Sequence, residues 1–351
     1  MKTNTRKFLV YLLVVVVVIV AILEIASRVI LSKLDKGYHC FEISKIEPYS
    51  PIVADSTYGY SLKDGNYSFT NQCGLTFAAQ HYKGERVPAL GPDSSSKGHV
   101  LVFGDSNIYG YGVEDSCTMP YYLQQLLPEY RIRNMGVPGW SALVSFLKLR
   151  DLLNDSNTKA PALVIFQLAD YDGGRITLTP MFLDAYKSEN IERRHFDLPY
   201  AYLKNDSLCI AKKSITNGPN ALADISALVN IASRYYLMKV SFSDEQIEEG
   251  NRATEALLRE IVSLCLRKKI KLLVAGYQLK EKRVERFKGI CTLPEQDIYF
   301  TNFTKPEDES LTLMPNDNHP SAKGHQYYAQ ILAKSIITDS ILAAPLDQLA
   351  H

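Results

Sequence analysis

The segment HVLVFGDSNIYGYGV, residues 99–113, constrains the fold of this chain more than any other stretch. Its apolar run from Val100 to Phe103 is typical of a buried parallel strand, and such strands end at the edge of a sheet where ligands bind. The strand runs directly into Gly104, Asp105 and Ser106. We therefore expect an α/β sheet with the Ser106 hydroxyl at its edge, close to the first amides of a following helix. Because Gly-Asp-Ser is also an ordinary turn or helix cap, this prediction needs support from elsewhere in the chain.

Support comes from MPNDNHPSAKGHQYYAQILA, residues 314–333. A nucleophilic serine needs a base within hydrogen-bond reach, and the base needs a carboxylate that fixes its tautomer. Asp317 lies two residues before His319, so this segment contains both groups. The alternative is that Asp317 and its two asparagine neighbours cap a helix starting at Pro320, which would not explain the histidine. We expect His325, in that following helix, to be structural.

A third segment, YRIRNMGVPGWSALVSF, lies between the other two. It predicts a short strand over Tyr130–Asn134, a turn that contains Gly139, and an apolar-periodic helix over Ser141–Leu153. A glycine in this turn lets the main chain approach a ligand closely, because it has no Cβ. A plain strand-to-helix turn would give the same pattern.

Together these segments resemble three of the four motif blocks of the SGNH (GDSL) hydrolase superfamily, over about residues 99–340. The resemblance implies acyl-ester chemistry, with Ser106 as the nucleophile, His319 as the general base and Asp317 orienting the histidine. It also implies that the amides of Ser106 and Gly139 stabilise the oxyanion. Such chemistry requires no metal and no organic cofactor.

The third motif block departs from the superfamily pattern. After a buried strand over Ala162–Gln167, the superfamily has Gly-x-Asn-Asp, whose asparagine donates a hydrogen bond to the oxyanion. Here Gln167 stands at the glycine position and Ala169 at the asparagine position. Loss of one oxyanion donor costs about 2.7–4 kcal/mol of transition-state stabilisation. Gln167 and Asn107 are candidate replacements, although either could simply satisfy local backbone groups.

The N-terminus predicts a membrane anchor. Phe8 to Leu23 is a run of sixteen apolar residues that follows three basic residues, Lys2, Arg6 and Lys7. Residues 8–31 can cross a bilayer if Glu24 and Arg28 pair on one helical face near the interface. The alternative is a cleaved signal peptide, which would have an unusually long apolar region and no evident cleavage site. We expect a single-pass protein with a cytoplasmic N-terminus and a periplasmic or extracellular main domain.

Composition excludes few functions. The chain has 39 basic and 38 acidic residues, so nothing indicates nucleic-acid binding through bulk charge. The six cysteines are widely spaced and show no zinc-site pattern. In an oxidising compartment the favoured pairs would be Cys40 with Cys73 or Cys265 with Cys291, and the sequence alone does not decide the connectivity.

We divide the chain into an anchor (1–31), a membrane-proximal segment with few periodic elements (32–96), a main domain (97–340) and a tail (341–351). Strands and helices alternate in the main domain, which predicts a doubly wound parallel sheet of flavodoxin type. Its later elements are expected at Asp244–Arg267 (helix), Ile270–Gly276 (strand) and Asp297–Phe303 (strand). An insert over 173–243, expected to hold a hairpin turning at 204–207 and a helix near Ala221–Met238, either covers the site or lies at the periphery.

Anchored members of the superfamily commonly remove or transfer O-acetyl groups on envelope polysaccharides. The resemblance therefore implies an esterase or O-acyltransferase whose substrate is an acylated carbohydrate, with a membrane acyltransferase as a partner and no nucleic acid. The missing asparagine leaves a second class open, a degenerate domain that binds an acylated glycan or a membrane partner without turnover. A third is a tethered structural protein whose Ser106 and His319 are coincidental.

Overall fold

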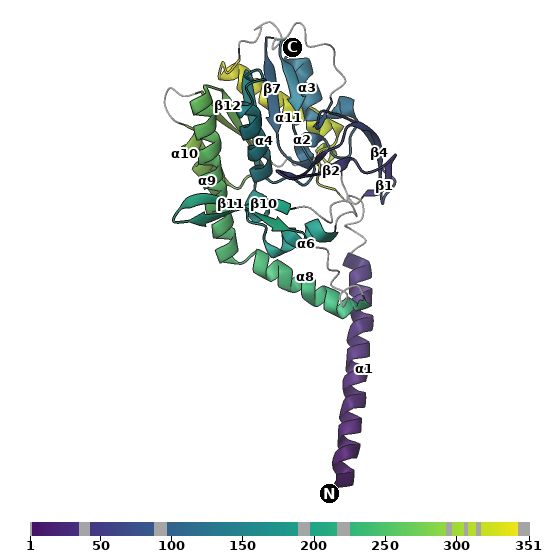
Figure 1. The fold of residues 1–351 in the computed structure, drawn as a ribbon. Helices are drawn as coiled ribbons and strands as arrows, with labels where there is room; N and C mark the ends of the chain where they lie inside the picture. The colour runs from purple at the N-terminus through teal and green to yellow at the C-terminus, as the bar shows by residue number, and fades with distance from the viewer. Residues whose placement is uncertain are drawn as a thin grey trace.

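The computed structural model describes residues 2–34, 43–87, 97–188, 197–215, 225–292, 297–304, 308–313 and 317–342. A long N-terminal helix, α1 (Lys2–Leu34), projects from a layered α/β domain (Figure 1). Several expectations fall outside the described ranges: Cys40 as a disulfide partner, the end of the membrane-proximal segment at 96, the start of the helix near Ala221, Asn316 as a cap, and the tail beyond residue 342.

The centre of the domain is a parallel sheet in the order β8-β7-β9-β12-β13. Numbered along the chain from β7, this order is 2-1-3-4-5, which confirms the predicted flavodoxin-type topology. β9 buries all seven of its residues, as a central parallel strand covered on both faces must. The bounds are β7 (His99–Phe103), β8 (Arg131–Asn134), β9 (Leu163–Ala169), β12 (Leu272–Tyr277) and β13 (Ile298–Phe303).

Helices cover both faces of this sheet. One face packs against α4 (Ala142–Asn154), α9 (Asp244–Lys268) and α10 (Glu281–Cys291), and the other against α3 (Met119–Leu126) and α11 (Ala322–Thr338). Successive residues of β9 alternate between the two cores, since Phe166 lies on the α9 side and Ile165 on the α11 side. The predicted catalytic motifs therefore follow strands that are packed against helices on both faces of the sheet.

The membrane-proximal segment is more regular than the sequence suggested. Its described part contains six strands, and four of them extend the main sheet antiparallel to nine strands, in the order β1-β4-β5-β6-β8. These strands were missed because they are short and closely separated by turns, although β5 alternates strictly between buried and exposed residues. Their bounds are β1 (Ile43–Glu47), β2 (Ile52–Asp55), β3 (Gly59–Leu62), β4 (Gly65–Asn71), β5 (Thr76–Tyr82) and β6 (Glu85–Arg86).

The insert after β9 contains α5 (Asp172–Ile176), α6 (Pro180–Ser188), β10 (Asp197–Lys204), β11 (Ser207–Ser214) and α8 (Ala227–Ser241). The predicted hairpin is confirmed, because Lys204 pairs with Ser207 across the turn. Asn205 and Asp206 both have positive φ, of 50° and 60°, which suits the tight turns that match the twist of a hairpin.

One of the two favoured cysteine pairs is wrong. Cys265 and Cys291 are both free thiols, buried between α9 and α10 in the core, where burial raises the pKa of each to about 12. They serve as small apolar residues there. Cys73 is disulfide-bonded, and Cys40, its expected partner, lies outside the described residues.

The N-terminal helix has the length and composition to cross a membrane. Within Thr5–Lys33, the apolar stretch of 18 residues has a mean hydropathy of 3.2, and none of this stretch is buried against the domain. Arg28 and Glu24 form the expected i, i+4 ion pair, with 2.8 Å between Nη2 and Oε1.

Candidate active site

Ser106 begins a four-residue helix, α2 (Ser106–Tyr109), at the end of β7. The Asp105 side chain caps this helix by accepting a hydrogen bond from the Asn107 amide at 2.9 Å. Gly110 ends it with φ of 87°, a left-handed conformation that glycine adopts without strain. The turn that was compatible with a simple cap is thus a cap that also fixes the Ser106 hydroxyl at the edge of the sheet.

The structure brings the three predicted catalytic residues into one hydrogen-bonded chain. His319 Nε2 lies 2.8 Å from Ser106 Oγ, and His319 Nδ1 lies 2.6 Å from Asp317 Oδ1. The same carboxylate oxygen accepts a bond from the His319 amide at 2.8 Å, so Asp317 holds both the ring and the backbone of the histidine. The ring of Tyr111 lies against the imidazole, with 4.7 Å between centroids.

Asp317 and Asn318 do not cap the last helix. α11 begins at Ala322, and its cap is Ser321, whose hydroxyl accepts a bond from the Gly324 amide. The capping alternative for Asp317 is therefore wrong. His325 is fully buried and accepts a bond from the Met119 amide through Nδ1, in keeping with a structural role.

Two residues that the sequence did not single out bind the carboxylate of Asp105. The Tyr171 hydroxyl donates to Asp105 Oδ2 at 2.6 Å, and Arg175 Nη1 donates to the same oxygen at 2.7 Å. Burial alone would raise the pKa of Asp105, but Arg175 and the Tyr171 hydroxyl hold it below its usual value. Their i, i+4 spacing directly after β9 was the available sequence signal.

Asn107 has no spare donor for an oxyanion. Its Nδ2 donates at 2.9 Å to Asp105 Oδ1 and at 2.8 Å to the Tyr171 hydroxyl. A side-chain amide has two N–H groups, so both are occupied. Asn107 thus belongs to the network that fixes the nucleophile turn.

Gln167 is placed differently. Its side chain is buried, and neither of its polar atoms has a partner among the residues that the structure describes. A Cβ added at Gly104, two residues before the nucleophile, would lie only 2.3 Å from Gln167 Oε1. Since a buried unpaired amide costs about 1–3 kcal/mol, this side chain beside the Ser106 turn needs an explanation.

Ala169 is buried at the end of β9, and its amide donates to Asp172 Oδ2 at 2.6 Å. Asp172 Oδ1 also accepts a longer bond, of 3.3 Å, from the Ala142 amide at the start of α4. Burial raises the pKa of Asp172 to about 6. This carboxyl joins the second and third motif segments.

Gly139 has φ of 77°, and the Tyr186 hydroxyl of α6 donates to its carbonyl. No group among the described residues accepts a bond from the amides of Ser106 or Gly139. A pocket beside Gly139 is lined by Trp140 and Ser141 before α4 and by Arg175, Tyr186 and Pro199 from the insert. It encloses about 210 Å³ of empty space, including its open mouth. The insert therefore contributes to a pocket whose lining includes Gly139 but neither Ser106 nor His319.

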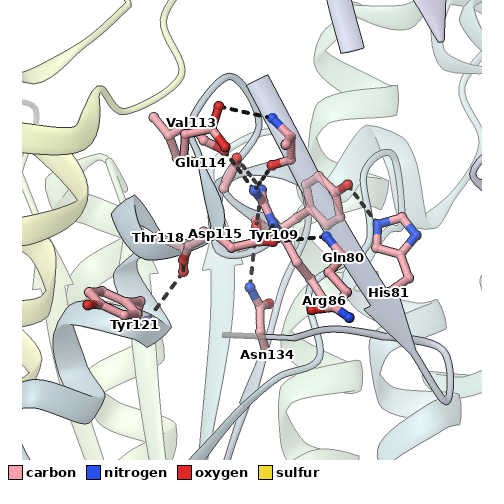
Figure 2. A network of polar contacts seen from close by, with 12 residues as sticks. Gln80, His81, Arg86, Tyr109, Val113, Glu114, Asp115, Thr118, Tyr121 and Asn134 are labelled. Atoms are coloured by element: carbon pink, nitrogen blue, oxygen red, sulfur yellow. Dashed lines mark hydrogen bonds and ion pairs between the residues drawn. The ribbon is translucent and has the colours of Figure 1, made fainter. Parts of the chain in front are cut away.

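A buried arginine supports the nucleophile segment from the N-terminal strands (Figure 2). Arg86 of β6 is 1% exposed and donates to the carbonyls of Tyr109, Gly110, Val113 and Ala78 and to the Asp115 carboxylate. The Tyr109 hydroxyl is in turn hydrogen-bonded to His81 Nε2 at 2.9 Å. The strands that the sequence did not predict thus fix the loop that leads to Tyr111.

A Ser-His-Asp chain at the carboxyl edge of a 2-1-3-4-5 sheet defines the class that this protein resembles, the SGNH (GDSL) hydrolases. Within the described ranges, no group of three His, Cys, Asp or Glu side chains could hold a metal ion. No protein-family model matches the chain, and no curated protein does.

Several solved structures are similar in overall fold. A lipolytic protein of the G-D-S-L family from Desulfitobacterium hafniense DCB-2 is 13% identical, with a TM-score of 0.36 over 68% of this chain and 99% of its own. TesA is 15% identical, with a TM-score of 0.39 over 70% and 99% of the two chains. The D162A mutant of the esterase AlinE4 is 19% identical, with a TM-score of 0.35 over 72% and 100%. At these values the argument for function depends on the site itself.

Proposed function

We propose that this chain is an extracytoplasmic serine esterase or O-acyltransferase that acts on short acyl esters, with acetylated cell-envelope glycans as its substrates. The observation that carries the proposal is the hydrogen-bonded chain from Ser106 through His319 to Asp317. Such a chain activates a hydroxyl for attack on an acyl carbonyl.

In the proposed reaction, Ser106 Oγ attacks the acyl carbonyl while His319 Nε2 takes its proton. Asp317 keeps the imidazole in the required tautomer and stabilises the imidazolium. His319 then returns the proton to the leaving alcohol, which gives an acyl-enzyme on Ser106. Water or a sugar hydroxyl then gives its proton to His319 and attacks this ester, and His319 passes the proton to Ser106 Oγ as the acid or the transferred acyl ester leaves. If the reaction is a transfer, a membrane acyltransferase would be the partner that supplies the acyl group.

The amides of Ser106 and Gly139, which have no acceptor among the described residues, would bind the oxyanion. Gln167 is our candidate for the third donor, because its amide is buried, unpaired and beside Gly104, whereas Asn107 uses both of its N–H groups. This assignment also explains why a costly unpaired amide is kept at the site.

The state of Cys73 supports the extracytoplasmic part of the proposal. The disulfide at Cys73 favours an oxidising compartment and hence a domain beyond the cytoplasmic membrane.

A fluorophosphonate probe on the full chain tests the proposal, because the probe reacts only with an activated serine. We expect labelling at Ser106, and loss of both labelling and acetyl-ester hydrolysis in Ser106→Ala. Ser310 provides a matched control: it lies in a short helical turn near α11 and is exposed, so Ser310→Ala should label like the parent chain. Labelling of another serine, or unchanged turnover by Ser106→Ala, would overturn the nucleophile assignment.

Ala169 specifically favours a second candidate, a degenerate domain that binds an acylated glycan without turnover. This function predicts no fluorophosphonate labelling and no acyl-enzyme in the parent chain. It also predicts saturable binding of an acetylated oligosaccharide that is unaffected by Ser106→Ala.

A further inference from the structure

Helix α8, in the insert, begins against the N-terminal helix α1. Glu24 of α1 accepts bonds from the amides of Ala227 and Leu228 at 3.0 and 3.1 Å and from the Ser226 hydroxyl at 2.8 Å. Arg28 donates to the carbonyl of Ile225 at 3.0 Å. A carboxylate at a helix N-terminus satisfies free amides and interacts favourably with the helix dipole. Glu24 and Arg28 therefore balance each other's charge and also bind the start of α8 to α1.

The two helices run in very different directions. α1 extends away from the domain, and α8 lies at a steep angle to α1 (Figure 1). α8 runs beneath α6 and the β10–β11 hairpin, on the side of the domain from which α1 projects. The buried residues of α8 lie at its two ends, Ala227 and Ser241. The Ser241 hydroxyl accepts a bond from the Met181 amide of α6 at 2.8 Å. Between these ends no residue of the helix is buried, and its second half from Arg234 to Lys239 is mostly exposed.

An apolar stripe runs along α8 and is largely exposed. Leu228, Ile231, Tyr235, Met238 and Phe242 follow the spacing i, i+3, i+7, i+10, i+14, which places them within an arc of about 80° on a helix. Tyr235 is 64% exposed, and Met238 and Phe242 are each 54% exposed. Lys239 lies beside this stripe and is also exposed. Exposure of such a face to water is unfavourable, whereas aromatic side chains with a nearby lysine suit the membrane–water interface.

The depth of α8 along α1 fits that interface. A hydrocarbon core of about 30 Å takes about 20 helical residues, so a core entered at Phe8 ends near Arg28. α8 starts at the level of Glu24, four residues or about 6 Å before that limit. Interfacial helices place their apolar face about 5–10 Å into the boundary between headgroups and acyl chains.

We propose that α8 is an interfacial helix whose Leu228–Phe242 stripe lies in the same lipid leaflet from which α1 emerges. This inference depends on the proposed membrane-spanning role of α1. It has a consequence for the site, because α6 rests on α8 and its Tyr186 hydroxyl binds the carbonyl of Gly139. Contact of α8 with lipid would fix the distance and orientation of the pocket beside Gly139 relative to the membrane surface.

Quenching by brominated lipid tests the proposal in the full chain reconstituted into phosphatidylcholine vesicles. Tyr235→Trp introduces a tryptophan on the stripe with little risk to folding, and Tyr82→Trp places one at a similarly exposed aromatic position on β5, at 56%. The native Trp140 is buried in the domain and serves as the background signal. We expect lipid brominated near the headgroup end of the acyl chains to reduce the added emission of the Tyr235→Trp variant strongly, with a blue shift, and to leave the Tyr82→Trp variant at the background level of quenching.

Equal quenching of the two variants would overturn the proposal. A second copy of the chain, or a protein partner, on this face would shield the tryptophan of the Tyr235→Trp variant from lipid and would have the same effect. Flotation of the chain with the vesicles separates this outcome from a failure of the anchor. A chain that floats but shows no quenching at position 235 refutes the role of α8 alone, whereas a chain that does not float refutes the role of α1.

Discussion

Replacement of Arg86 should destabilise the whole domain. Its guanidinium donates five hydrogen bonds, to four backbone carbonyls and to Asp115, and it is 1% exposed (Figure 2). Arg86→Met leaves these acceptors without a donor in a buried setting. Removal of one partner of a buried ion pair costs about 3–5 kcal/mol of folding free energy. Because four bonds to carbonyls are lost as well, we expect a loss near the upper end of this range.

For a domain of this size, that loss corresponds to a fall of roughly 6–20 °C in the melting temperature. Trp140 is the single tryptophan and is buried, so its emission reports unfolding of the full chain in detergent. Arg252→Met is the matched control: Arg252 pairs with Asp206 at the surface, with exposed fractions of 52% and 86%, so we expect a loss of at most about 1 kcal/mol. If Arg86→Met melts within about 2 °C of the parent, the buried network does not hold the nucleophile loop and our reasoning is refuted.

Three further predictions concern the site and its surroundings. Gln167→Leu should lower kcat about 10²-fold with little change in KM, because an oxyanion donor acts in the transition state. It should also raise the free energy of unfolding by about 1 kcal/mol, because it removes an unpaired buried amide. An unchanged kcat would exclude Gln167 as a donor. Ala169→Asn should add little to the parent chain but restore most of the rate in the Gln167→Leu background, whereas no rescue would show that position 169 does not face the oxyanion. Burial lowers the pKa of His81 to about 4, so between about pH 6.5 and 4 the unfolded chain binds a proton at this residue that the folded state does not. The free energy of unfolding should therefore fall as the pH drops from 6.5 toward 4. If the melting temperature of His81→Gln depends on pH as steeply as that of the parent, this prediction is contradicted.

The core of the fold was predictable because its information is local. The apolar run before Gly104, the periodic helices and the Asn205–Asp206 turn each specify their own geometry, and alternation along the chain then leaves few topologies. The short strands of residues 43–86 were not predicted, because strands of two to seven residues between turns give little periodic signal and are stabilised by pairing with distant segments.

The candidate site divides in the same way. Residue types, spacing and the resemblance to the SGNH motif blocks predicted Ser106, Asp317 and His319 as candidate catalytic residues, because the chemistry requires a nucleophile, a carboxylate and a base in recognisable local contexts. The separation of Gln167 from Asn107 needed the tertiary structure, since only the arrangement of neighbours shows which amide already has partners. The same holds for the free thiols of Cys265 and Cys291. The sequence determined which groups this protein has, and the tertiary structure decided which of them meet, because hydrogen bonds, ion pairs and disulfides form between segments that only the packing of the sheet brings together.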